Sequence, residues 1–143
     1  MRRINFSNIS TVTILSVMLL ASVFTSCASN PKEIPATKTL EELKLTAYEY
    51  SAKENYNAAI RYYNEVIARF GTDTAVLIAA RFEIAHIYVK QKKFKEAEPM
   101  LNEILAYYDS ASFYLPSQYK TLAQIDLQKI SDHKNKANKK KSK

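Results

Sequence analysis

The chain has 143 residues, a formal charge of +7, 47% hydrophobic residues, one glycine and one cysteine. This length fits one small domain, and a single glycine, the residue that most easily adopts φ > 0, argues against a turn-rich all-β fold and for helices. One cysteine excludes an internal disulfide, and one glycine excludes a GxGxxG or Walker-type phosphate loop.

The first 26 residues have the three parts of an export signal. Arg2 and Arg3 form a positive start, an apolar run covers residues 9–24, and the small residues Thr25 and Ser26 follow. The run is shorter than the roughly 20 residues that span a hydrocarbon core, which weakens the interpretation as a permanent membrane helix. We therefore predict a signal peptide over residues 1–26.

Cys27 directly follows these small residues, and the stretch resembles a bacterial lipobox. Phe24 and Ser26 replace the usual Leu and the usual Gly or Ala, so the site looks like the relaxed lipoboxes of spirochaetes and some other diderms. The resemblance implies that Cys27 carries lipid, detectable as palmitate, and that the protein faces the periplasm from the cell envelope, at the outer membrane.

Two other outcomes of the same segment remain open. An ordinary signal peptidase could use Ser26 and Ala28 and release a soluble periplasmic protein, or the apolar segment could stay uncut as an anchor. A catalytic thiol is disfavoured because no His or Lys lies near Cys27 in the sequence. Residues 27–38 are polar, contain Pro31 and Pro35, and are predicted to form a tether.

The body of the chain repeats with a spacing of 38 residues, and self-similarity of this kind indicates a repeat architecture. Small and aromatic residues return at this spacing, and a third step takes Ala85 to Ala123. The matched pairs are Ala47 with Ala85, Tyr50 with Tyr88, Tyr56 with Phe94, Ala59 with Ala97, Tyr63 with Leu101, and Ile67 with Leu105.

Each repeat is predicted to be a helical hairpin. Thr39 and Glu42 form a capping box before the first helix, residues 53–55 interrupt its apolar pattern, and a second helix covers about residues 56–70. Gly71 follows where a helix favours a left-handed C′ residue. Pro116 is predicted at the N1 position of a final helix that covers the second repeat.

The residues Ala47, Tyr50, Tyr56, Ala59 and Tyr63 resemble the signature of the tetratricopeptide repeat. The resemblance implies an all-α, right-handed solenoid over residues 39–130, with about two repeats and a C-terminal capping helix. The usual period is about 34 residues, and the longer spacing here resembles the BamD-like lipoproteins of outer-membrane β-barrel assembly. A plain antiparallel helix bundle remains the alternative.

No catalytic, cofactor or metal motif stands out, because His86 and His133 are isolated and no Ser-His-Asp order occurs. We expect a protein that is not an enzyme and uses no cofactor or metal. It would act as an adaptor for other cell-envelope proteins or peptides, or associate with itself because so few repeats leave a solenoid end uncovered.

In tetratricopeptide repeats the first helix of each hairpin lines a concave groove, so the resemblance implies a set of partner-binding residues. Some of them could instead pack against the final helix. By matched position the set is Glu41, Lys44, Tyr48, Ser51, Phe82, His86 and Lys90.

The positive charge of the chain lies at its two ends, in Arg2 and Arg3 and in the Lys-rich segment from Lys129 onward, so the body is close to neutral. Residues 131–143 are predicted to be a disordered basic tail that attracts anionic lipid headgroups or simply aids solubility. An exported protein rarely meets nucleic acid, so we expect no nucleic-acid partner.

Overall fold

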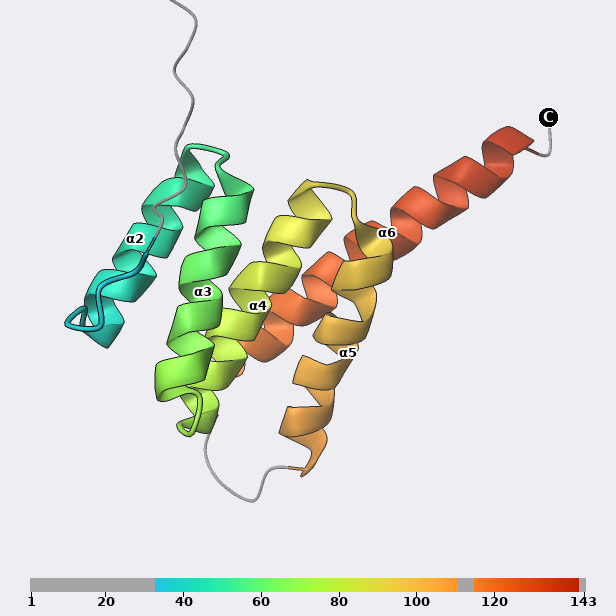
Figure 1. Cartoon of the computed structure of the whole chain (residues 1–143). Coiled ribbons are helices and arrows are strands. Elements are labelled where there is room, and N and C mark those ends of the chain that lie inside the picture. Colours follow the sequence, from blue (N-terminus) through green and yellow to red (C-terminus); the bar gives the residue numbers. More distant parts are fainter. Residues whose placement is uncertain (1–32, 111–114, 142–143) are drawn as a thin grey trace, which may run out of the picture.

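The computed structural model describes residues 33–110 and 115–141, and this part contains five helices that stack in chain order (Figure 1). The predicted all-α fold, with two helical hairpins and a final helix, is confirmed. The signal peptide and Cys27 lie outside the described residues. The helices are α2 (Leu40–Ala52), α3 (Tyr56–Phe70), α4 (Thr74–Lys90), α5 (Phe94–Ser110) and α6 (Ser117–Lys141).

The central helix α4 contributes to both hydrophobic clusters of the domain. Its residues Ala80, Ile84 and Ile87 pack with α2 and α3, whereas Ile78 and Phe82 pack with α5 and α6. This arrangement explains why α4 is apolar around most of its circumference, as expected for a helix with neighbours on several sides.

The repeat is visible in the packing and in the turns. Ala47, Ala85 and Ala123, each 38 residues apart, are all fully buried, because a residue without a larger side chain lets neighbouring helices approach closely. The two hairpin turns are also alike: Glu54 has φ 58° and Lys92, 38 residues later, has φ 59°. In each turn two backbone N–H groups donate to carbonyls in the last turn of the preceding helix.

Left-handed backbone at a residue with a side chain is unfavourable by roughly 1–2 kcal/mol, so these turns can be improved. We expect Lys92→Gly, and likewise Glu54→Gly, to raise the free energy of unfolding by about 1 kcal/mol. Lys53→Gly is the control, because Lys53 has φ −88° and glycine there only adds freedom to the unfolded chain. Urea unfolding measures all three, and a loss of stability in Lys92→Gly would contradict the expectation.

The helix ends agree with the sequence except at Gly71. The capping box of Thr39 and Glu42 is present, with the Thr39 N–H donating to a Glu42 carboxylate oxygen at 2.7 Å. The prediction of a left-handed Gly71 is wrong, because this residue has φ −71°. Glycine is favoured there for a different reason: a Cβ atom would collide with the carbonyl oxygen of Ile67. The final helix begins at Ser117, one residue after the predicted Pro116.

Part of the predicted tether belongs to the domain. Ile34 packs against the first hydrophobic cluster, and the Arg69 guanidinium donates to the carbonyl oxygens of Ala36 and Lys38, both at 2.6 Å. Arg69 also lies 3.7 Å from a carboxylate oxygen of Glu65. The structure therefore differs from the prediction of a free tether at residues 34–38, because one long side chain on α3 binds three backbone carbonyls, including that of Pro35.

The basic tail also differs from the prediction of disorder, because α6 continues through it to Lys141. Its first turn is attached to α5: the His133 ring lies 4.8 Å from that of Phe94, and Lys134 pairs with Glu98 at 2.6 Å. Lys and Ala are good helix formers, so a helix held at one end can extend into this segment. Within residues 33–110 and 115–141, none of the helices is long and apolar enough to span a bilayer.

Candidate functional site: a groove between α2, α4 and α6

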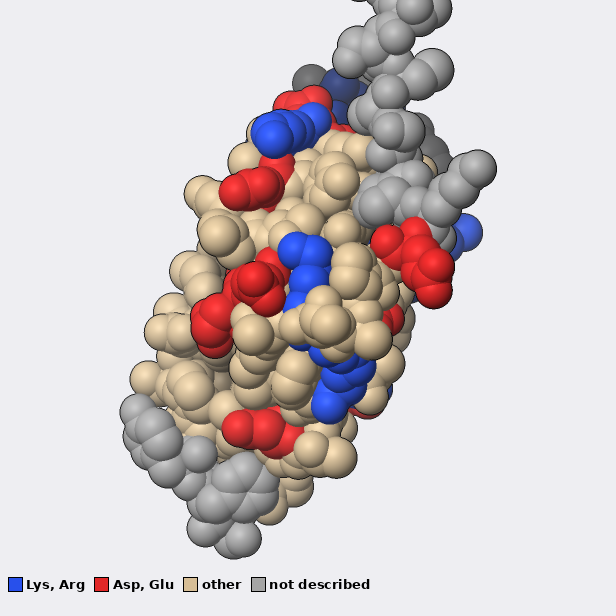
Figure 2. Space-filling model, turned by 60° about the vertical axis from the view of Figure 1, so that its left-hand side comes forward, with Lys and Arg blue, Asp and Glu red and all other residues tan. Residues whose placement is uncertain are grey.

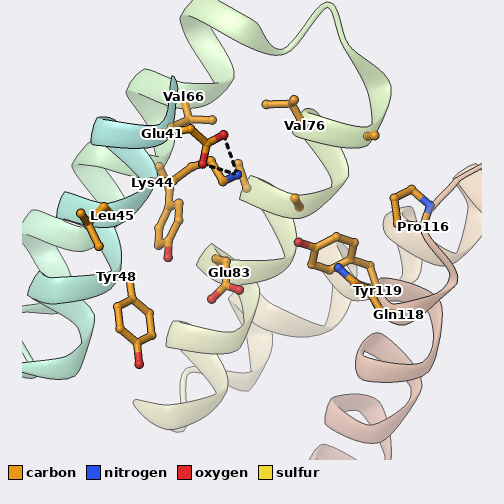
Figure 3. Close-up of a pocket in the computed structure, with 14 residues that line it drawn as sticks. Glu41, Lys44, Leu45, Tyr48, Val66, Val76, Glu83, Pro116, Gln118 and Tyr119 are labelled. Carbon is orange, nitrogen blue, oxygen red and sulfur yellow. Dashed lines mark hydrogen bonds and ion pairs between the residues drawn. The ribbon is translucent and has the colours of Figure 1, made fainter. Parts of the chain in front are cut away.

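A pocket of about 500 Å³ opens between α2, α4 and the start of α6, with α3 at its base. It exists because α4 packs against α6, whereas α2 and α4 scarcely touch. Small residues of α4 at this position, Ala75, Ala79 and Ala80, leave the space open. We call this pocket the groove, and Figure 3 shows side chains of three helices around it.

The α2 wall of the groove is apolar and accessible to solvent. Leu45 is 59% exposed and Tyr48 is 65% exposed, although both are large hydrophobic side chains. Tyr63 and Val66 of α3 are buried beneath them, and Tyr119 projects from α6 on the opposite side (Figure 3). Tyrosines on a concave apolar surface are typical of protein-binding sites.

Three of the seven predicted groove residues line this pocket: Glu41, Lys44 and Tyr48. Ser51 and Lys90 are not among its lining residues. Phe82 is only 4% exposed, and its ring lies 5.7 Å from those of His86 and Tyr119. Phe82 and His86 therefore pack against α6, the alternative that the sequence left open for such residues.

The contact of His86 with α6 is a buried polar one. His86 Nδ1 lies 2.6 Å from a carboxylate oxygen of Asp126, and Lys129 Nζ donates to the other oxygen at 2.8 Å. Asp126 is 1% exposed. Burial raises the pKa of the Asp126 carboxyl, but the hydrogen bonds from His86 and Lys129 outweigh it, so the net pKa is lowered. This cluster fixes α6 against α4 and thereby the groove wall that carries Tyr119.

Glu83 has the opposite electrostatic character. It points from α4 into the groove, between the α2 side chains and Tyr119 (Figure 3). Burial raises the pKa of its carboxyl, and the positive charges of His86 and Lys90 only partly oppose that effect. Burial also raises the pKa of the Tyr63 phenol, with Glu83 contributing, so this hydroxyl stays protonated and can donate a hydrogen bond.

Sequence reasoning missed Leu45, Glu83 and Tyr119. A signal for two of them existed: Glu83 lies 38 residues after Leu45, so the two occupy the same place in successive repeats. Tyr119 was visible only as part of the final helix, and its position in the groove depends on how that helix packs. Among residues 33–110 and 115–141 no cluster of three or more His, Cys, Asp or Glu side chains could hold a metal.

Charges on the body are mixed in sign. Figure 2 shows Lys and Arg side chains beside Asp and Glu side chains on one face, separated by larger areas of other residues. This distribution agrees with a nearly neutral body, and it directs attention to individual charges in the groove.

Comparison with known proteins agrees with this geometry. The sequence model of the tetratricopeptide repeat family matches residues 50–115. The chain is also 40% identical over 113 residues to an uncharacterized protein of Treponema pallidum (strain Nichols), an alignment that covers 77% of this chain and 45% of that protein. The chain thus spans less than half the length of this relative. No solved structure matches the chain. The helical hairpins and the family match together show that this chain carries tetratricopeptide repeats in an all-α solenoid.

Proposed function

We propose that this protein is a membrane-anchored adaptor of the bacterial cell envelope, and that its groove holds a segment of a partner protein. Tetratricopeptide repeats generally mediate protein–protein interactions and typically serve as non-enzymatic scaffolds. The observation that carries the proposal is the groove itself, where the large apolar side chains Leu45 and Tyr48 remain exposed beside a pocket of about 500 Å³.

The anchoring part of the proposal rests on the sequence before the domain. An export signal ends at a cysteine, and Treponema pallidum, the source of the relative described above, is a spirochaete, the group whose relaxed lipoboxes resemble this one. A role in outer-membrane assembly is supported by the 38-residue spacing alone, which resembles that of BamD-like lipoproteins. The second candidate is a soluble periplasmic accessory protein, favoured by the small residues Ser26 and Ala28.

Labelling with radioactive palmitate tests the anchor. We expect the full chain, expressed in a spirochaete host, to incorporate label, and Cys27→Ala to incorporate none. Label in both proteins, or in neither, would contradict lipidation at Cys27. An unlabelled protein that begins just after Ala28 would favour the soluble candidate.

Photo-crosslinking tests the groove. A benzoylphenylalanine at Tyr48 is expected to form adducts with one defined protein in intact cells, whereas the same residue at Glu96, exposed on α5, forms none. Filling the pocket by Ala79→Phe should abolish the Tyr48 adduct. Equal adducts from both positions would show that the groove is not the contact surface.

A further inference from the structure

The groove carries one charge that nothing nearby neutralises. Its charged lining residues are Glu41, Lys44 and Glu83. Lys44 Nζ lies 3.2 Å from a carboxylate oxygen of Glu41, so these two compensate each other at the rim, as the dashed line in Figure 3 shows. The remaining charge is that of Glu83, deeper in the pocket.

Glu83 forms no hydrogen bond or ion pair with any residue of 33–110 or 115–141. The nearest candidates on its own helix serve elsewhere, because His86 Nδ1 is bound to Asp126 and Lys90 is exposed. A half-buried carboxylate without a partner is unfavourable, and one hydrogen-bonded cation would relieve the cost. Polar groups left in this condition within a cavity are good candidates for ligand contacts.

The surroundings of Glu83 define the rest of the ligand. The exposed large hydrophobic residues of the described chain are Leu45 and Tyr48 on α2 and Leu122 and Ile125 on α6. On α6, Leu122 and Ile125 follow Gln118 at spacings of four and seven, so the three share one helical face, and Gln118 lines the groove. Apolar side chains therefore lie on the two helices that border the groove.

We propose that the occupant of the groove is a partner segment with a lysine or arginine flanked by apolar side chains, and that this cation pairs with Glu83. The inference deepens, and rests on, the adaptor function proposed above. Such a segment would place apolar side chains on Leu45 and Tyr48 and along the stripe of Leu122 and Ile125. The ion pair would supply specificity, because acidic segments would be rejected by the same carboxylate.

Selection from a random library of 16-residue peptides displayed on phage tests the proposal. The full-length chain, purified in detergent, is the bait, and three variants are compared with it: Glu83→Gln, Ala79→Phe to fill the groove, and Glu49→Gln as an exposed control on the far side of α2. Thermal melting checks the folding of each variant. Because Glu83 has no partner to lose, Glu83→Gln should melt no lower than the unaltered chain.

We expect the selected peptides to share a Lys or Arg between apolar residues. Binding of the strongest synthetic peptide should weaken about tenfold in Glu83→Gln, as for loss of one charge-assisted contact, and should not change in Glu49→Gln. Selected peptides without a cation, or equal binding by Glu83→Gln, would overturn this inference while leaving a peptide-binding groove. Selection that Ala79→Phe does not abolish, or no selection at all, would overturn both proposals.

Discussion

Replacing Leu101 with alanine is expected to lower the free energy of unfolding by about 2–5 kcal/mol. Leu101 is completely buried in the second hydrophobic cluster, where α4, α5 and α6 meet, and alanine would leave a cavity that rigid helices cannot close. For a domain of this size the melting temperature should fall by about 10 °C or more, measured by circular dichroism.

Leu122→Ala is the matched control, because the same atoms are removed from a leucine that is 40% exposed on α6. We expect its melting temperature to stay within a few degrees of that of the unaltered protein. If the two substitutions had equal effects, the assignment of Leu101 to a tightly packed core would be wrong. The control also indicates whether the exposed apolar stripe on α6 serves stability.

Asp126→Asn is expected to lower the free energy of unfolding by about 1.5–3 kcal/mol near neutral pH. Asparagine keeps the shape of the side chain but loses the charge that His86 and Lys129 bind, while the site stays buried. Because the cluster joins α6 to α4, hydrogen exchange should accelerate along α6 more than along α2. Asp132→Asn, an exposed change on the same helix, should have little effect on either measurement.

The effect of Asp126→Asn should depend on pH in one direction. The folded pKa of Asp126 lies below its ordinary value of 3.8, so the folded state holds the ionised form more strongly than the unfolded state does. Its contribution is complete above about pH 3.8 and disappears as the pH falls through the lowered folded pKa. Urea unfolding at pH 6 and pH 3 should show a smaller difference between the two proteins at pH 3. An unchanged difference would contradict the ionised cluster.

The sequence predicts the helices well because their determinants are local. The capping box at Thr39, the break after Ala52 and the matched alanines depend on residues within one hairpin, and the structure contains each of them. The first-repeat groove residues follow from the same regularity. In the second repeat the prediction fails for Phe82 and His86, because α6 covers the face of α4 that corresponds to the open face of α2.

The buried Asp126 was missed because a carboxylate in a Lys-rich helix is usually exposed. A signal was nevertheless present: Asp126 lies three residues after Ala123 and four before Ile130, both buried, so helical spacing puts it on the apolar face. The partner His86 lies 40 residues earlier, and no local pattern connects the two. The pairing depends on how α6 docks, which is a tertiary property.

The contacts of Arg69 also limit how far the domain can stand from a membrane. Because this side chain and the packing of Ile34 fix residues 34–38 to the domain, the only chain free to extend after Cys27 ends at Ile34. Seven residues reach at most about 25 Å. With lipid on Cys27, the domain would be confined to a shallow layer next to the bilayer, so a partner that fills the groove must itself extend into that layer.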